Sequence, residues 1–363
     1  MKAGSSPLRV RTTRSATALL LAGGMFLSGN MIASAQDTTT PPTTTPDPTT
    51  TTPAPTLEIP AALLGSLGSV PGATTTPNPT TTASPGPQLP GGALGSLGSG
   101  SADVHLDPTP RLASIPNFRD VAGSEGGGYE GLAGRHLKRG VIYRSDDLAS
   151  ASDEDLATLS SLNIKHIYDL RGETEISNPL VGGPDKIPAG ADYKHIPIEF
   201  GDLIALAQSI QSPEEGRQFM IDANRSFVSD PAKREGFKQL LTEIANSDGP
   251  VLFHCSAGKD RTGWIAALLL TIGGVQQQAV YDDYLLSNTY LAESNAATLA
   301  QIRAALGDQA ALNLEPVLAV DKSYLEAAFE QMRADYGGPV AYLADGLGLE
   351  QMTIAKLAKK LNF

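Results

Sequence analysis

The sequence predicts an α/β domain with a mixed or parallel central sheet, flanked by helices and followed by a helical C-terminal half. Two observations indicate this class. Short apolar segments typical of buried strands alternate with longer segments in which apolar residues have helical spacing. Beyond residue 275 the strand-like segments stop, and helical patterns continue to residue 363. A third observation, the Thr- and Pro-rich composition before residue 103, indicates where the domain begins.

The first 102 residues are expected to lie outside the folded domain. Residues 1–35 combine a basic start, an apolar stretch and small residues at 33–35, which is typical of a cleaved secretion signal. The apolar stretch is short and interrupted by glycine, which argues against a retained membrane anchor. Residues 36–102 are almost entirely Thr, Pro, Gly, Ser, Ala and Leu, a composition that predicts a disordered linker. We therefore expect a secreted or surface-displayed protein with one domain over residues 103–363.

The charge balance excludes several classes of partner. Removing residues 1–35 takes away four basic and no acidic residues, which leaves 23 basic against 39 acidic residues and a formal charge of −16. Such a chain is not expected to bind nucleic acid or anionic membranes nonspecifically. The chain has one cysteine, so no intramolecular disulfide can form. The five histidines are scattered without the spacing of metal ligands, so no metal or other cofactor is expected.

The expected elements follow from local patterns. In chain order they are a helix over 152–162, a strand over 165–170, a helix over 231–246, a strand over 250–255 and a helix over 262–274. Ser152 is a good N-cap, because acidic residues follow it directly and apolar residues then recur at helical spacing. The run at 250–255 is continuously apolar before its last two residues, as in a buried strand. After Val275, helix breaks are expected near Gly307, near Pro316 and at residues 337–339.

The loop after the last strand carries the chemistry. The strand ends at Cys255 and the helix begins near Arg261, so the residues between them form a tight connection. These residues are Ser256, Ala257, Gly258, Lys259 and Asp260. Several successive N–H groups in such a loop can point inward and make an anion-binding nest at a helix N-terminus. The sequence thus predicts a phosphate-binding loop.

A cysteine at the base of this loop is expected to be a nucleophile. The loop dipoles and the guanidinium of Arg261 both favour the thiolate, which is the reactive form. Arg261 can also hold two phosphoryl oxygens in its planar fork. Thr262 is expected to donate its hydroxyl to the thiolate, and His254 to fix the loop through ring hydrogen bonds. The alternative is a buried structural cysteine, which would leave the charged run Lys259–Arg261 unexplained.

The string "HCSAGKDRTG" over residues 254–263 resembles the signature loop of the cysteine-dependent protein tyrosine phosphatases. Further segments make the chain similar to the secreted, atypical bacterial branch typified by mycobacterial enzymes. They are "NFRDVAG" (117–123), "YRSDDL" (143–148), "DLRGETE" (169–175), "DYLLSN" (283–288) and "YGGPVAYLADGLGL" (336–349). They occur in the family's order and, with the loop, span most of residues 110–290 and part of the C-terminal half.

The resemblance implies a phosphatase fold and a phosphorylated cysteine intermediate that water hydrolyses without a metal. It also implies broad substrate choice: phosphotyrosine, phosphoserine or phosphothreonine, and phosphoinositides. Lys259 inside the loop is similar to the extra cation of phosphatases that act on inositol lipids. Its alternative role is surface solvation, so the resemblance leaves protein and lipid substrates both open.

The resemblance further implies roles for acidic and basic residues around the loop. A phenolate leaving group benefits from a proton donor. Asp260 is the favoured general acid and Asp169 is the second candidate, although Asp169 could instead pair with Arg171 or Arg119. Three sets of residues are expected near the site: Arg119 with Asp120 as a supporting pair, Arg144, and the two acids Asp146 and Asp147.

The family's helical lid would correspond to residues 290–332, where it would shield the thiolate from oxidants. The alternative is that these helices simply complete the core. Two positions depart from the family pattern. Ala122 stands where glycine is usual, and Ser256 replaces a bulkier residue, which leaves the pocket wall and substrate preference open.

Three other readings compete with a phosphatase. A rhodanese-type sulfurtransferase has a loop shorter by one residue and lacks the Asp-Arg-Thr ending. An arsenate reductase needs additional cysteines. A non-enzymatic phospho-ligand binding module or surface adhesin would not need Cys255, Arg261 and Thr262 together. The sequence contains no pattern that indicates an oligomeric state.

Overall fold

The computed structural model describes residues 109–124, 127–177, 182–200 and 209–362. The predicted secretion signal and linker, residues 1–102, lie outside these residues. Within the described part of the chain, no helix has the length and apolar character needed to cross a membrane.

A mixed five-stranded sheet forms the centre of the domain. The strands are β1 (Arg119–Asp120), β2 (Ile142–Ser145), β3 (His166–Asp169), β4 (Asp192–His195) and β5 (Val251–His254). Their order is β1-β2-β5-β3-β4, and every pairing is parallel except that of β1 with β2. The strand β5, which leads into the cysteine loop, therefore lies between two parallel neighbours. The predicted mixed α/β class is confirmed.

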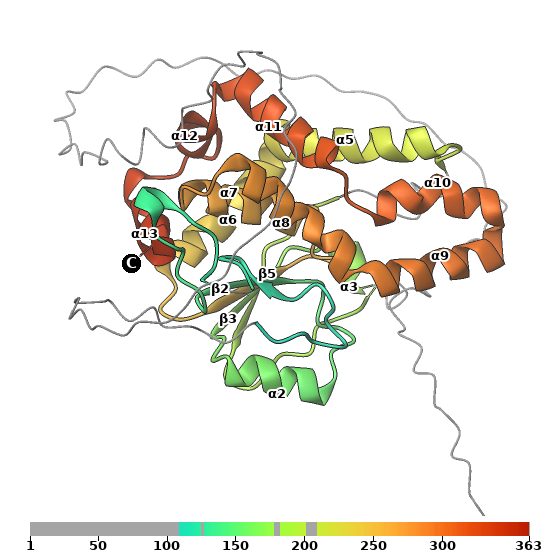
Figure 1. Ribbon diagram of the computed structural model, residues 1–363, viewed down its shortest axis with the longest axis horizontal. Coiled ribbons are helices and arrows are strands. Elements are labelled where there is room, and N and C mark those ends of the chain that lie inside the picture. The colour runs from blue at the N-terminus through green and yellow to red at the C-terminus, as the bar shows by residue number, and fades with distance from the viewer. Residues whose placement is uncertain (1–108, 125–126, 178–181, 201–208, 363) are drawn as a thin grey trace, which may run out of the picture.

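Helices cover both faces of the sheet, as Figure 1 shows. The helix α2 (Asp153–Ser161) lies on one face. The remaining helices are α3 (Glu173–Ser177), α5 (Pro213–Ser229), α6 (Pro231–Asn246), α7 (Arg261–Ile272), α8 (Gln277–Tyr290), α9 (Ala292–Leu306), α10 (Asp308–Leu318), α11 (Lys322–Tyr336), α12 (Pro339–Ala341) and α13 (Gln351–Asn362). Two short non-α turns, η3 (Leu132–Gly134) and η4 (Tyr342–Gly346), are the other helical elements of the described residues.

Alternating side chains of the strands place a core on each face of the sheet. Val251 and Phe253 of β5 belong to the larger core, which α6, α7, α8 and α11 complete. Leu252 points to the other face and packs in a smaller core with Leu159 of α2. Since β5 is apolar on both faces, it is held in the interior, and its C-terminal end is fixed where the loop begins.

Most predicted elements are confirmed, with boundaries shifted by one or two residues. The helix expected over 231–246 is α6, and the Ser152 hydroxyl accepts a hydrogen bond from Asp155 N at 3.1 Å as the N-cap of α2. The expected breaks at Gly307 and at 337–339 occur. The break expected near Pro316 occurs three residues later, at 319–321, because α10 continues to Leu318 and α11 begins at Lys322. Pro316 lies in the last turn, where the helix is about to end anyway.

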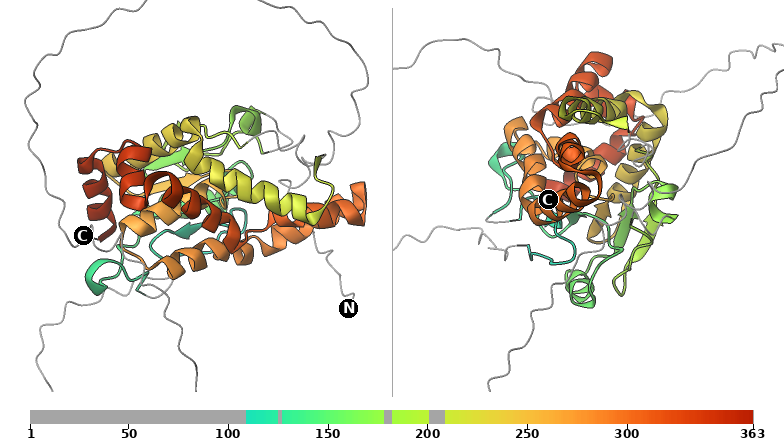
Figure 2. Two further views of the ribbon diagram at one scale, coloured as in Figure 1. Left: turned by 90° about the horizontal axis from the view of Figure 1, so that it is seen from above. Right: turned by 90° about the vertical axis from the view of Figure 1, so that its right-hand side faces the viewer.

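The helices expected to form a lid fall into two groups. In Figure 1 and the left view of Figure 2, α9 and α10 project at one end of the molecule. Their buried residues form a small separate cluster that includes Ile302, Ala311 and Leu314. By contrast α11 is a core helix, and its Phe329 ring packs edge-on against Trp264 with centroids 5.4 Å apart. The segment predicted as a lid, residues 290–332, is therefore too long, because it includes the core helix α11. Only α9 and α10 lie outside the main core, as a lid would.

Candidate active site

The loop Cys255–Asp260 connects the end of β5 to the start of α7, at the edge of the sheet where β2 and β3 also end. Ligand sites in α/β proteins form at this edge. Gly258 has a φ of +65°, and a Cβ there would lie 2.1 Å from the main-chain oxygen of Ser145. Only glycine fits this position, so the loop can curl tightly against β2.

Three successive carbonyl groups of the loop are turned outward by hydrogen bonds. Ser256 O accepts from Asp147 N at 3.1 Å, Ala257 O from Asn117 Nδ2 at 2.8 Å, and Gly258 O from Arg144 Nη2 at 2.8 Å. The N–H groups of residues 256–260 donate to no described residue. This arrangement leaves a row of main-chain donors that could bind an anion.

The donor Arg144 is itself held by a buried network. Arg144 Nη1 donates to Asp283 Oδ2 at 2.9 Å, and Arg119 Nε lies 3.4 Å from Asp283 Oδ1. Tyr129 also donates its hydroxyl to Asp283 Oδ1 at 3.2 Å. Burial and the neighbouring Arg119 lower the pKa of Arg144 to about 10, so it remains a cation at neutral pH. Asp283 of α8 thus anchors the loop through Arg144.

Arg119 and Asp120 do not form the supporting pair that the sequence predicted. Adjacent residues of a strand point in opposite directions. Asp120 accepts hydrogen bonds from Ala122 N at 2.9 Å and from Gly140 N, so it stabilises the turn after β1. Burial raises the pKa of Asp120 to about 6. Arg119 belongs to the loop network, and Asp120 does not.

The guanidinium of Arg261 has two edges that can donate hydrogen bonds. One edge is bound to protein groups, and the other has no partner among the described residues. Nη1 and Nη2 of Arg261 form a two-point ion pair with Glu175, with both distances 2.7 Å. Nη1 also donates to Leu170 O and Ile198 O, at 3.2 and 3.0 Å. Nε is buried and has no partner among the described residues. The edge formed by Nε and the second hydrogen of Nη2 is therefore free to bind two phosphoryl oxygens.

Glu175 is the residue that sequence analysis missed, although it ends the quoted segment 169–175. Besides Arg261 it contacts the Ser256 hydroxyl and accepts from Gly172 N at 2.8 Å. Burial alone would raise the pKa of Glu175, but Arg261 together with the hydrogen bonds from Ser256 and Gly172 outweighs burial and lowers it. The signal that could have indicated this residue was its place in an acidic segment of the resembling family. Its partner, however, lies 86 positions away in the chain.

A partly open cavity of about 150 Å³ lies above the loop. The side formed by the loop contains Cys255, whose exposed fraction is 3%, together with Glu175 and with Ser256, Ala257, Lys259, Asp260 and Arg261. The opposite wall is apolar. It consists of Phe200, Met220, Ile302, Leu314, Val317 and Leu318, so α9 and α10 cover the cysteine.

Lys259 and Asp260 both line this cavity. Lys259 Nζ lies 2.9 Å from Asp260 Oδ2 and donates to Val317 O at 2.8 Å and Ala319 O at 3.2 Å. The second oxygen of Asp260 is buried without a partner among the described residues, and so is the Thr262 hydroxyl. Lys259 thus has contacts for all three of its ammonium hydrogens and is not a solvated surface residue.

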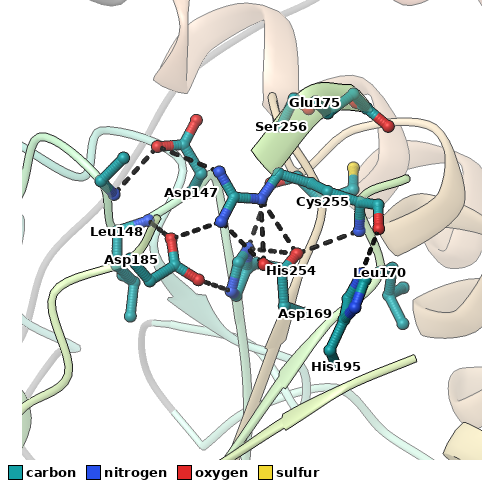
Figure 3. A network of polar contacts seen from close by, with 12 residues as sticks. Asp147, Leu148, Asp169, Leu170, Glu175, Asp185, His195, His254, Cys255 and Ser256 are labelled. Atoms are coloured by element: carbon teal, nitrogen blue, oxygen red, sulfur yellow. Dashed lines mark hydrogen bonds and ion pairs between the residues drawn. The ribbon is translucent and has the colours of Figure 1, made fainter. Parts of the chain in front are cut away.

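Asp169 lies beneath the loop and does not line the cavity. Figure 3 shows it in a buried charge network with His254 and Asp185, and ion pairs join Arg171 to the same network. Arg171 Nη2 lies 2.7 Å from Asp169 Oδ2 and 2.8 Å from Asp185 Oδ1. Burial would raise the pKa of Asp169, but His254 and Arg171 outweigh it and lower that pKa. The pairing of Asp169 with Arg171, one of the two sequence alternatives, is therefore observed.

His254, the last residue of β5, is also part of this network. Burial alone would lower its pKa, but Asp185 and Asp169 raise it to about 9. The ligating atoms of Asp169, Asp185 and His254 lie within 4.8 Å of one another, a spacing compatible with a metal ion. Arg171 already supplies positive charge between the two carboxylates. Their negative charge is therefore balanced without a metal ion.

The remaining predicted residues lie at the edges of the site. Asp147 supports the loop through its N–H, and burial raises the pKa of its carboxyl to about 6. Asp146 accepts from Asn117 N at 2.9 Å, and burial raises its pKa well above the usual value. Ala122 is buried in the turn after β1 and does not line the cavity. Ser256 lines it, so the departure at 256 bears on pocket shape and that at 122 does not.

The model of the Tyrosine phosphatase family matches residues 110–362, more than two thirds of the chain. A tyrosine-protein phosphatase of Cupriavidus necator is 32% identical over 263 residues, which are 69% of this chain and 92% of that protein. The triple specificity protein phosphatase PtpB of Mycobacterium tuberculosis is 28% identical over 276 residues, covering 66% of this chain and 94% of that protein.

Among solved structures, P. aeruginosa TpbA matches with 22% identity and a TM-score of 0.22, over 49% of this chain and 88% of that one. The family match includes the whole Cys255 loop, its supporting residues and the helices that cover it. The chain therefore belongs to the tyrosine phosphatase family.

Proposed function

We propose that this tyrosine phosphatase works through a phosphorylated Cys255, with Arg261 binding the transferred phosphoryl group. The observation that supports the proposal is the arrangement of hydrogen-bond donors around the loop. Three of its carbonyls are turned outward, its N–H groups have no partner among the described residues, and one edge of Arg261 is open on the same cavity as Cys255. These donors suit the equatorial oxygens of a phosphoryl group, whose charge they stabilise in the transition state.

The reaction has two steps. The Cys255 thiolate attacks phosphorus, so a sulfur–phosphorus bond forms while the bond to the leaving oxygen breaks. The electron pair of that bond goes to the leaving oxygen, which takes a proton from Asp260. Water then attacks phosphorus and gives a proton to Asp260. The sulfur–phosphorus bond breaks, its electron pair returns to sulfur, and inorganic phosphate is released.

Phosphate release from a panel of substrates, in the presence of EDTA, tests this proposal. The panel contains a phosphotyrosine peptide, a phosphoserine peptide and phosphatidylinositol phosphates. We expect turnover of the phosphotyrosine peptide, and acid quenching during turnover should trap phosphate on Cys255, the single cysteine of the chain. Turnover without any phosphocysteine would refute the mechanism. A folded protein that binds the phosphopeptide but turns over no member would instead be a binding module.

Asp260 is proposed as the general acid because it lines the cavity, whereas Asp169 is bound to Arg171 beneath it. We expect Asp260→Asn to lower kcat for phosphotyrosine by about 10²–10⁴-fold. The loss should shrink for aryl phosphates whose phenols are more acidic, since those leaving groups need less help. Rates measured over a series of aryl phosphates check this. A leaving-group dependence in Asp169→Asn instead of Asp260→Asn would reverse the assignment.

We further propose that phosphoinositides and phosphoserine or phosphothreonine are additional substrates. The name of the mycobacterial relative, a triple specificity phosphatase, supports this breadth. The apolar wall suits the ring of a tyrosyl group, while Lys259 is the cation available to a second phosphate. Because Lys259 contacts Val317 O and Ala319 O, a second phosphate would have to displace these two carbonyls. The lipid members of the panel decide this point.

Export through residues 1–35 and a spacer over residues 36–102 also stand as proposals, supported by composition. The phosphatase would then act outside the cell on phosphorylated proteins or lipids. Expression of the full chain in a bacterial host, followed by N-terminal sequencing of protein from the medium, tests this. A mature N-terminus near residue 36 is expected, and retention of the intact chain in cells would contradict export.

A further inference from the structure

Asp185 is a buried carboxylate for which the reaction above has no use. It lies in the connection between α3 and β4, and its side chain is almost completely buried. One oxygen, Oδ1, accepts from Leu148 N at 2.9 Å and lies 2.8 Å from Arg171 Nη2. The other, Oδ2, lies 3.0 Å from His254 Nε2. The carboxylate is thus fixed on one side by Leu148 and Arg171, and its other side faces the residue that precedes Cys255.

We propose that Asp185 is a positioning residue for the phosphatase reaction, which fixes the orientation and the positive charge of the His254 ring directly behind Cys255. The proposal rests on the proposed role of Cys255 as nucleophile. Figure 3 shows the His254 ring on the Asp185 side of the strand end and the cysteine sulfur toward Ser256 and Glu175.

The atoms nearest to the two ring nitrogens of His254 determine whether the imidazole is protonated. Nε2 faces a carboxylate oxygen of Asp185, and Nδ1 faces the carbonyl oxygen of Cys255 at 3.2 Å. Both oxygens carry no hydrogen. A neutral imidazole has one nitrogen with a lone pair, which would point at one of these oxygens and be repelled. The imidazolium avoids this repulsion and pairs with Asp185 by charge, although Nε2 and Oδ2 are not aligned as a hydrogen bond. A raised pKa of about 9 for His254 agrees.

The surroundings of His254 leave Asp185 as its nearest charged partner. The charged or titratable groups that act on it are Asp185, Asp169, Arg171, Asp146 and Asp147, and the main-chain carbonyl of Cys255 also contacts it. Asp169 lies farther away, at 3.8 Å from Nδ1, and is already held by Arg171 and by the hydroxyl of Tyr193. Removing Asp185 therefore removes the shortest ion pair of the ring.

A cation behind Cys255 favours the thiolate. The His254 ring contacts the main-chain carbonyl of Cys255, whereas Asp185 contacts the ring and makes no contact with Cys255 among the described residues. The proposal therefore assigns the larger effect on the thiolate to the charge of the ring. Loss of that charge should make the thiolate harder to form. The pH dependence of Cys255 reactivity reports this directly, and alkylation of the single cysteine measures it without turnover.

The test is the rate of iodoacetamide alkylation as a function of pH in wild type, Asp185→Asn, His254→Gln and the double variant. We expect the midpoint of the profile to rise by about one pH unit in Asp185→Asn. The value of kcat/KM should fall about tenfold below neutral pH and recover at high pH. Because Asp185 acts through His254, the double variant should match His254→Gln.

A matched control is Asp248→Asn, which removes the same carboxylate–histidine contact at 3.0 Å, with His166, on the exposed surface. It should leave the alkylation profile unchanged. An unshifted midpoint in folded Asp185→Asn, or additive shifts in the double variant, would overturn the proposal. If Asp185→Asn does not fold, an unshifted midpoint in His254→Gln overturns it as well. Should Cys255→Ser retain turnover, the proposed function fails, whatever the alkylation profiles show.

Discussion

Cys255→Ser is expected to lower kcat for phosphotyrosine at least about 10⁴-fold while the fold is retained. Serine differs by one atom and keeps the loop packing, but its hydroxyl is not ionised at neutral pH. The N–H row and Arg261 remain, so inorganic phosphate should still bind. Single-turnover rates and a phosphate titration by calorimetry measure the two effects separately.

The control for this variant is wild-type protein in which Cys255 has been alkylated. The alkylated protein should be as inactive as Cys255→Ser. Because the chain has one cysteine, alkylation affects no second thiol. Turnover of Cys255→Ser near the wild-type rate would show that another group attacks phosphorus. Loss of both turnover and phosphate binding would show that the loop had collapsed, and the experiment would then move to Cys255→Ala.

Glu175→Gln is expected to cost about 3 kcal/mol in the free energy of unfolding and to lower kcat/KM by about 10–100-fold. The glutamate is the counter-ion of the buried Arg261, and removal of one partner leaves an uncompensated buried charge. Glutamine also loses one of the two acceptors that orient the guanidinium, so the free edge is no longer directed at the phosphoryl site.

Denaturant unfolding and steady-state kinetics of Glu175→Gln check this prediction. Glu173→Gln, two residues earlier in α3, makes the same change of charge at an exposed position and should be nearly neutral. Wild-type stability and wild-type kcat/KM in Glu175→Gln would show that Arg261 is oriented by Leu170 O and Ile198 O alone.

The sequence predicted those parts of the site that are local in the chain. The strand, the loop and the helix around Cys255 are consecutive, so apolar runs and small residues were sufficient to place Cys255, Arg261 and the N–H row. Their supporting residues were not predictable in this way. Glu175 and Asp283 lie 86 and 139 positions from the arginines that they hold, and Asp185 lies in a Gly- and Pro-rich connection. Such contacts depend on sheet order, which no local pattern contains.

The errors have the same physical origin. Arg119 and Asp120 are adjacent in sequence, but strand geometry separates their side chains. The segment 290–332 is uniformly helical in pattern, so only packing distinguishes the covering helices α9 and α10 from the core helix α11. The core position of α11 comes from its burial against segments that are distant in the sequence, and helix propensity does not reveal it.

The contact between Lys259 and the end of α10 has a consequence for measured affinities. The carboxyl end of a helix carries a partial negative charge, so α10 acts as an intramolecular competitor for any anionic group that needs this lysine. A tethered competitor cannot be diluted. The apparent dissociation constant of such a ligand exceeds its intrinsic value by the inverse of the fraction of molecules in which Lys259 is free. For a ligand with a single phosphate, bound only by the loop amides and Arg261, this correction disappears.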